Sequence, residues 1–149
     1  MKEELRLALQ AMDAALRDGR TGTEMLTRAC RILQQLPGYT GVYIYALEDD
    51  TLVLKAFYGR ATEHTRIPSG KGICGASVQT RAPVIVDDVA SDPRYLACNL
   101  ETRSEIVFPI LRGEAYLAQI DVDSDDPAAF GKEDEAFLAE VAQRLEPLL

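Results

Sequence analysis

Residues 115–124, AYLAQIDVDS, carry the pattern that most limits how this chain can fold. Successive side chains of a β-strand point to opposite faces of the sheet. The apolar residues of this segment therefore share one face: Tyr116, Ala118, Ile120 and Val122. Asp121 and Asp123 share the other face, about 7 Å apart. The pattern predicts a sheet with one face in the core and a cluster of carboxylates on the opposite face.

The preceding segment, residues 105–112, extends this prediction. Its apolar face is made by Ile106, Phe108 and Ile110, which leaves Glu105 on the opposite face. A hairpin with a three-residue turn at residues 112–114 brings both apolar faces to the same side and suits a glycine at its centre. In this register Glu105 lies directly across from Asp121.

Three carboxylates on one face admit two interpretations. A solvated polar face is the usual place for charged residues. However, like charges opposite each other on neighbouring strands are destabilising. The cluster of Glu105, Asp121 and Asp123 is therefore easier to explain if it binds a cation, such as the ammonium group of an amino-acid-like ligand.

The rest of the chain alternates between helix and strand patterns. Apolar residues recur at helical spacing near both termini, and runs rich in β-branched and aromatic residues lie between them. The predicted helices cover residues 2–17, 21–36, 72–81 and 132–145, and the predicted strands cover 41–47, 51–59, 64–68, 84–88, 105–112 and 115–124. This order favours an α+β fold in a single domain, residues 1–149, whose antiparallel sheet of about six strands is covered by the terminal helices.

The chain has three cysteines, Cys30, Cys74 and Cys98. An odd count without an export signal argues against a structural disulfide framework and favours redox chemistry. Cys30 lies at the edge of a helical apolar stripe and is expected to be a small buried residue. Cys74 begins a short helix whose dipole would lower its thiol pKa, and Cys98 lies in a loop that can fold over the same face. With one histidine and no Cys-x-x-Cys, no metal site is expected.

Charge and hydropathy exclude several classes of partner. The net charge is −8 and the basic residues are scattered, so the chain lacks the footprint of a nucleic-acid-binding protein. No apolar run reaches the length of a membrane-spanning helix, and the N-terminus does not resemble a secretory signal. We expect a cytoplasmic protein.

The glycines before the short helix permit another interpretation. Gly70, Gly72 and Gly75 form G-x-G-x-x-G, and Asp88 follows eighteen residues after the first of them, as in a dinucleotide-binding fingerprint. The helix that follows is short for a parallel crossover, and no second βαβ unit appears. The nucleotide-dependent oxidoreductase is therefore the least favoured interpretation.

The chain resembles the GAF-domain free methionine-(R)-sulfoxide reductase family over nearly its whole length. The resemblance runs through GVYIYALEDDTLVLKAFYG, TRIPSGKGICG, VDDVASDPRYLACN, SEIVFPI and IDVDS. It is strongest in the spacing of the residues that match the family's functional positions, namely Cys74, Cys98, Glu105, Asp121 and Asp123.

The resemblance implies a GAF fold with a loop-covered pocket on the sheet face opposite the terminal helices. The carboxylates would bind the ammonium group of free methionine sulfoxide or help to protonate its oxygen. Cys98 would be the nucleophile and Cys74 its resolving partner, a thioredoxin-type dithiol would restore the thiols, and no cofactor would be required. A homodimer formed through the terminal helices is also implied.

Two positions depart from the family pattern. His64 stands where the family commonly has another cysteine. It is either a partly exposed strand residue, or a polar neighbour of the pocket or an aid to thiolate formation. Tyr39 stands where the family often has a tryptophan in the pocket wall. If the missing cysteine is indispensable, the chain would instead be a non-catalytic GAF module that senses or binds a small molecule or a redox state.

Overall fold

The computed structural model describes residues 1–19, 22–96 and 100–149. Its sheet has six strands in the order β3-β2-β1-β6-β5-β4, and every pairing described is antiparallel. The helices are α1 (Glu3–Arg17), α2 (Gly22–Gln34), α3 (Gly72–Thr80) and α4 (Lys132–Leu145), with short 3-10 turns at Val89–Ser91 and Glu146–Leu148. The strands are β1 (Gly41–Glu48), β2 (Thr51–Tyr58), β3 (Arg66–Pro68), β4 (Val84–Val86), β5 (Ser104–Arg112) and β6 (Ala115–Ser124). The predicted α+β fold is confirmed.

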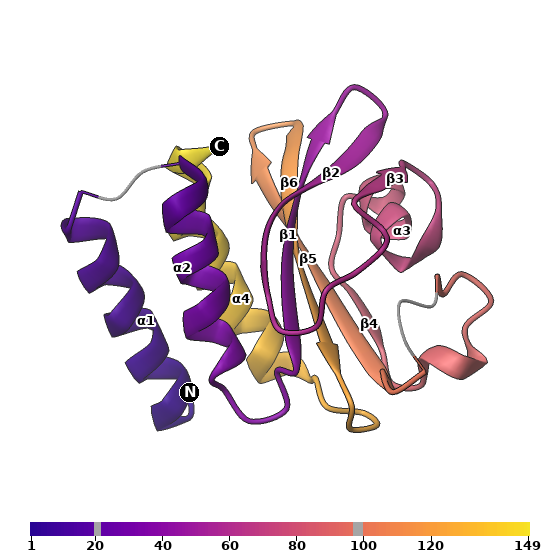
Figure 1. Cartoon of the computed structure of the whole chain (residues 1–149), viewed down its shortest axis with the longest axis horizontal. Helices are drawn as coiled ribbons and strands as arrows, with labels where there is room; N and C mark the ends of the chain where they lie inside the picture. The colour runs from indigo at the N-terminus through magenta and orange to yellow at the C-terminus, as the bar shows by residue number, and fades with distance from the viewer. Residues whose placement is uncertain (20–21, 97–99) are drawn as a thin grey trace.

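The helices are divided between the two faces of the sheet (Figure 1). Helix α2 packs on β1 and β2, α4 packs on β5, and α1 packs on α2 and α4. Helix α3 lies on the other face, beside β3 and β4. The prediction that terminal helices cover one face is therefore confirmed, and the opposite face is left for α3 and its neighbouring loops.

Side chains that alternate between the two faces of β1 contribute to two separate hydrophobic cores. Val42 and Ile44 of β1 are buried against the terminal helices. Tyr43 and Tyr45, which alternate with them, belong to a second buried cluster with α3, β3 and β4. Because both faces of β1 are covered, side chains that point away from the terminal helices are also removed from water.

The β5–β6 hairpin differs from the predicted register. Arg112 pairs with Ala115, and the register shifts between Ile110 and Leu111, so Leu117 is an extra residue in β6. The predicted three-residue turn is wrong because this β-bulge takes up the additional residue within the strand. Glu105 therefore lies across from Asp123, not from Asp121. The partner of Glu105 has moved by two residues, and side chains alternate between faces, so Glu105, Asp121 and Asp123 still share one face.

The bulge also reverses the orientation of the first residues of β6. Leu117 packs against the core beneath the terminal helices. Tyr116 faces α3, where its hydroxyl lies 2.9 Å from Ser77 Oγ. The prediction that Tyr116 shares the face of Ala118 and Ile120 is wrong for this reason.

The glycine motif before α3 serves close packing. A Cβ atom on Gly75 would lie 2.7 Å from the Gly70 nitrogen, and one on Gly72 would lie 2.9 Å from Leu96 Cδ1. Because β4, which follows α3, pairs antiparallel with β5, the parallel βαβ unit of a dinucleotide-binding fold is not formed here. Among the described helices, none is long and apolar enough to cross a membrane.

Candidate active site

A small cavity lies between the sheet and α3, on the face opposite the terminal helices. Its walls come from β1, β3, α3, β5, β6 and the segments that hold His64 and residues 95–96. The lining residues are Tyr45, His64, Ile67, Gly72, Ile73, Cys74, Tyr95, Leu96, Glu105, Asp121 and Asp123. The structure thus brings together Cys74, the three predicted carboxylates and His64.

The cavity is closed in this conformation. Its volume is about 20 Å³, which is enough for about one water molecule and too small for an amino acid. Tyr95 and Leu96, together with His64, form the parts of the wall that come from loops rather than from the sheet or α3. Binding of an amino-acid ligand therefore requires this side of the cavity to open.

The three carboxylates are almost completely removed from water. Glu105, Asp121 and Asp123 are 5%, 6% and 5% exposed. Among the described residues, no hydrogen-bond partner reaches Oδ1 of Asp121 or Oδ1 of Asp123. Burial raises the pKa of Asp121. Burial, followed by the negative charge of Asp121, raises the pKa of Asp123 well above its usual range, while hydrogen bonding from Glu105 opposes both shifts. Such a cluster is stabilised by protons or by a cation.

Cys74 lies directly against this cluster. Its thiol donates a hydrogen bond to Asp121 Oδ2 over 3.4 Å, and the residue is 6% exposed. Burial, with the negative charges of Asp121 and Glu105, raises the pKa of Cys74 well above the usual thiol range. The prediction that the start of α3 lowers this pKa is wrong, because burial beside carboxylates outweighs the partial charge of one helix end.

Two functional neighbours were missed by the sequence analysis. Gln119 of β6 is fully buried and donates from Nε2 to the Cys74 carbonyl oxygen over 3.3 Å. Tyr45 donates its hydroxyl hydrogen to the His64 carbonyl oxygen over 2.7 Å. Gln119 could have been found, because strand alternation places it on the face of Asp121. Tyr45 could have been found in the same way, because alternation along β1 places it on the face opposite Val42 and Ile44.

Tyr39 does not reach the cavity. Its ring packs on the other side of the sheet, with centroid distances of 5.5 Å to Phe130 and 6.3 Å to Phe137. Its hydroxyl donates to Asp134 Oδ1 over 2.8 Å. The prediction that Tyr39 forms the aromatic wall is therefore wrong, and Tyr45 and Tyr95 supply the aromatic rings of the cavity.

The remaining cysteines have separate outcomes. Cys30 is fully buried in the core beneath the terminal helices, and burial raises its pKa to about 12. The expectation of a buried residue is confirmed. Cys98 lies outside the described residues, so its predicted role stays a prediction.

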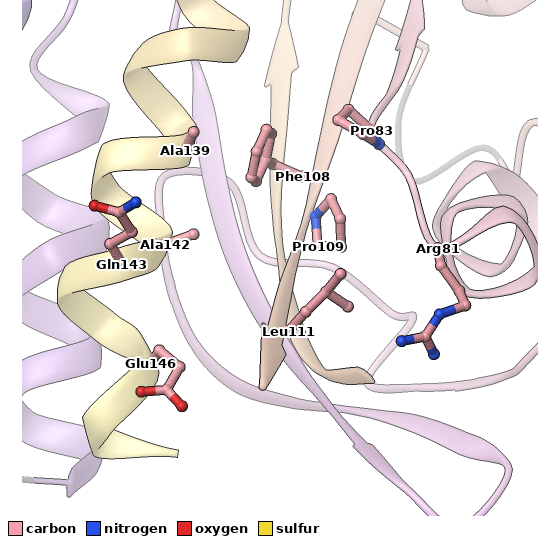
Figure 2. Close-up of a pocket in the computed structure, with 9 residues that line it drawn as sticks. All are labelled: Arg81, Pro83, Phe108, Pro109, Leu111, Ala139, Ala142, Gln143 and Glu146. Carbon is pink, nitrogen blue, oxygen red and sulfur yellow. The ribbon is translucent and has the colours of Figure 1, made fainter. Parts of the chain in front are cut away.

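A larger hollow lies between α4 and β5, with a volume of about 510 Å³ (Figure 2). It is bordered mainly by apolar side chains, among them Phe108, Leu111 and Ala139, with Arg81 and Glu146 at its rim. Its described lining includes no cluster of nucleophilic or titratable groups comparable to the one around Cys74. Size alone therefore does not make it the better candidate for a catalytic site.

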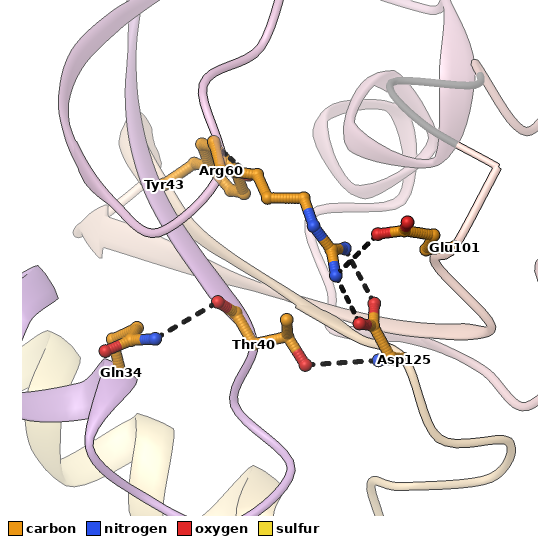
Figure 3. Close-up of polar contacts among 6 residues, drawn as sticks. All are labelled: Gln34, Thr40, Tyr43, Arg60, Glu101 and Asp125. Atoms are coloured by element: carbon orange, nitrogen blue, oxygen red, sulfur yellow. Dashed lines mark hydrogen bonds and ion pairs between the residues drawn. The ribbon is translucent and has the colours of Figure 1, made fainter.

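Polar contacts at the end of β6 join the loops around the site (Figure 3). Arg60 makes a bidentate ion pair with Asp125, with one contact of 2.7 Å, and a second ion pair of 2.8 Å with Glu101. Tyr43 donates to the Arg60 carbonyl oxygen over 2.6 Å. Arg60 thus links the β2–β3 connection to β6 and to the segment that leads into β5.

Residues 20–148 match the sequence profile of the GAF domain. The chain belongs to the GAF-domain family. The structure of type II free methionine-R-sulfoxide reductase from Thermoplasma acidophilum is 42% identical, with a TM-score of 0.82, and the match covers 85% of this chain and 90% of that one. The corresponding enzyme of Neisseria meningitidis, solved in complex with its substrate, is 30% identical with a TM-score of 0.91 over 99% of this chain and 90% of that one.

Two curated relatives of this GAF domain, from Escherichia coli and Saccharomyces cerevisiae, carry the same name. Free methionine-R-sulfoxide reductase of Escherichia coli is 37% identical over 70% of this chain and 63% of its own length. The match therefore spans about three-fifths of that relative. The resemblance stated from the sequence is confirmed at the level of the family.

Proposed function

We propose that this GAF domain reduces free methionine-(R)-sulfoxide to methionine by thiol and disulfide chemistry. The observation that carries the proposal is the convergence of Cys74, Glu105, Asp121 and Asp123 on one cavity. These residues come from three separate elements, and the relatives at 42% and 30% identity are free methionine-R-sulfoxide reductases.

The carboxylates provide the recognition of a free amino acid. An ammonium group is a compact cation with three hydrogen-bond donors. Oδ1 of Asp121 and Oδ1 of Asp123 are buried acceptors without another partner among the described residues. Charge-assisted hydrogen bonds from the ammonium group to these oxygens and to Glu105 would offset the cost of burying the cluster. A methionine sulfoxide within a polypeptide lacks this group.

The chemistry proceeds in three steps. Cys98 attacks the sulfoxide sulfur as the thiolate, the sulfur–oxygen bond of the substrate breaks, and one proton is taken up. The oxygen is transferred to the Cys98 sulfur, where a new sulfur–oxygen bond replaces the one broken in the substrate, so methionine leaves and Cys98 carries a sulfenic acid. Cys74 then attacks the Cys98 sulfur, its proton and the hydroxyl group leave as water, and a disulfide remains. An external dithiol reduces that disulfide by exchange.

The surroundings of Cys74 support one order of the thiols. A thiol whose pKa is raised by burial and by carboxylates is a poor first nucleophile. The same thiol donates to Asp121 Oδ2, so Asp121 is placed to accept its proton when Cys74 attacks the sulfenic acid. These features support Cys98 as nucleophile and Cys74 as resolving residue.

His64 lines the same cavity, and we propose that it is a polar neighbour of the substrate. We further propose a thioredoxin-type dithiol as reductant, a reducing cytoplasmic compartment, and a homodimer formed through the terminal helices. These proposals rest on the family resemblance. Turnover with thioredoxin and sedimentation of the purified protein test the first and the last of them.

The second candidate is a GAF module that binds a small ligand without turnover. The replacement of a family cysteine by His64 favours it, because only one resolving thiol is then left. Absence of turnover together with measurable binding of methionine sulfoxide would establish this alternative.

The deciding experiment measures consumption of free methionine-(R)-sulfoxide by the purified protein with thioredoxin or dithiothreitol. We expect turnover with both reductants, no methionine release in Cys98→Ser, and a single turnover of methionine release in Cys74→Ser. Cys30→Ser is the matched control, because Cys30 lies on the other side of the sheet, and it should retain turnover. No consumption by the unaltered protein would overturn the proposal.

A further inference from the structure

We propose that the closed cavity binds one thiophilic divalent cation of the Zn²⁺ class through Cys74, Glu105 and Asp121, and that this ion excludes the amino-acid substrate. The inference concerns regulation of the proposed active site and rests on the proposed function for that consequence. The binding itself depends only on the geometry of the described residues.

The three ligand atoms have the spacing of a metal site. One atom each from the Cys74 thiol and from the Glu105 and Asp121 carboxyl groups lies within 4.8 Å of both others. Cys74 Sγ and Asp121 Oδ2 are 3.4 Å apart. Tetrahedral coordination with Zn–S of about 2.3 Å and Zn–O of about 2.1 Å requires a sulfur–oxygen separation of about 3.6 Å. Small side-chain adjustments therefore suffice to enclose an ion.

The unpartnered oxygens are suited to bind a cation. Oδ1 of Asp121 is buried without a hydrogen-bond partner among the described residues, and Oδ1 of Asp123 is in the same condition. Both side chains are more than nine-tenths buried and line the cavity. A divalent ion would compensate the thiolate and the carboxylates together, which a single hydrogen bond cannot do. Asp123 is the candidate for a fourth ligand.

The size of the closed cavity favours a single ion over an amino acid. A volume of about 20 Å³ accommodates one ion or one water molecule, whereas the proposed amino-acid substrate requires the cavity to open. A metal ion would therefore stabilise the closed conformation and compete with the substrate. Sulfur ligation favours zinc-like ions over magnesium or calcium, which prefer sets of oxygen ligands.

The ligands of this site do not form a local sequence motif. Cys74 lies on α3, Glu105 lies on β5 and Asp121 lies on β6. They meet only through the packing of α3 on the sheet. The expectation of no metal site rested on the single histidine and the absence of Cys-x-x-Cys, and it did not consider ligands that the fold brings together from distant segments.

The test is a titration of the fully reduced, chelator-treated protein with Co²⁺, followed by the thiolate-to-cobalt charge-transfer absorption in the near ultraviolet. We expect saturation at one ion per chain and loss of the band when Zn²⁺ is added. Cys74→Ser should abolish the band, and Asp121→Asn should weaken binding by about tenfold or more. Cys30→Ser and Cys98→Ser should retain the band, and circular dichroism of each variant checks that it folds.

The outcomes separate this inference from the proposed function. Absence of the band in the unaltered protein overturns the metal site, whether or not the protein turns over. Loss of the band in Cys98→Ser would also overturn it, because the ligand set would then be different. If the band appears and no substrate is consumed, the metal site stands and the proposed reductase activity fails. Where turnover is observed, Zn²⁺ should raise KM for methionine sulfoxide with little change in kcat.

Discussion

The Sγ atom of Cys74 lies 3.4 Å from Oδ2 of Asp121, to which it donates a hydrogen bond. This contact joins α3 to β6, and Gln119 reinforces it by holding the carbonyl group of the same cysteine. A thiol in this position stays protonated until it attacks, and Asp121 can then accept its proton. The pair therefore suits the second thiol step of the proposed cycle rather than the first.

Replacement of Asp121 by asparagine should separate the two thiol steps. The amide would keep the shape of the side chain but would not take the proton of Cys74. We expect kcat with a dithiol reductant to fall by about a hundredfold, the lower end for loss of a general base. The sulfenic acid of Cys98 should then accumulate and be trapped by dimedone, which mass spectrometry detects. Asp13→Asn is the control, because Asp13 lies on α1 and pairs with Arg144 on the other side of the sheet. Unchanged turnover in the Asp121 variant would refute this role.

The carboxylates should discriminate free from blocked substrate. Asp123→Asn and Glu105→Gln each remove one charged acceptor from the proposed ammonium site, and a hydrogen bond to a charged group is worth about 1.5–3 kcal/mol. We expect KM for free methionine sulfoxide to rise by about 10- to 100-fold. The KM for N-acetylmethionine sulfoxide, which lacks the ammonium charge, should change much less. Equal effects on both substrates would argue that these residues do not bind the ammonium group.

The sequence correctly predicted that the carboxylates share one face of the sheet. Side chains alternate between the two faces, so an error of two residues in the register leaves each of them on the same face. The sequence did not predict the partner of Glu105 or the orientation of Tyr116, because the bulge at Leu117 leaves no clear local signal. The sequence also did not predict the raised pKa of Cys74. Helix position is local, whereas burial beside Asp121 depends on tertiary packing. Tyr39 was misplaced for a similar reason, since it lies two residues before β1, where strand alternation does not yet fix the side to which a side chain points.

Two tyrosines allow the corrected position of the aromatic wall to be tested. Tyr39→Phe removes the hydrogen bond to Asp134 on the helix side, so we expect a loss of about 1–2 kcal/mol in the free energy of unfolding and an unchanged KM. Tyr45→Phe releases the His64 carbonyl group at the cavity and should raise KM. Urea unfolding and steady-state kinetics measure the two effects. A raised KM in Tyr39→Phe with normal stability would restore Tyr39 to the pocket.

The ion pair between Arg60 and Asp125 should contribute to stability only above the acid range. Hydrogen bonding from Arg60 and its positive charge lower the pKa of Asp125. As the pH falls below about 4, the unfolded chain takes up this proton before the folded protein does. The contribution is therefore present above the unfolded pKa and is lost as the pH falls through the folded pKa. Both side chains are more than a third exposed, so its size should be about 0.2–1 kcal/mol.

Arg60→Gln tests this linkage and its connection to the site. We expect the urea midpoint of the variant to decline less steeply with acidification than that of the unaltered protein. Arg144→Gln is the matched control, because Arg144 lowers the pKa of Asp13 between α4 and α1. It should flatten the acid decline similarly and leave KM unchanged, since that pair is remote from the cavity. The positive charge of Arg60 also opposes the raised pKa of Asp123 in the cavity, so Arg60→Gln should change KM as well. Equal KM values in both variants would show that the Arg60 contacts stabilise the fold without influencing the cavity.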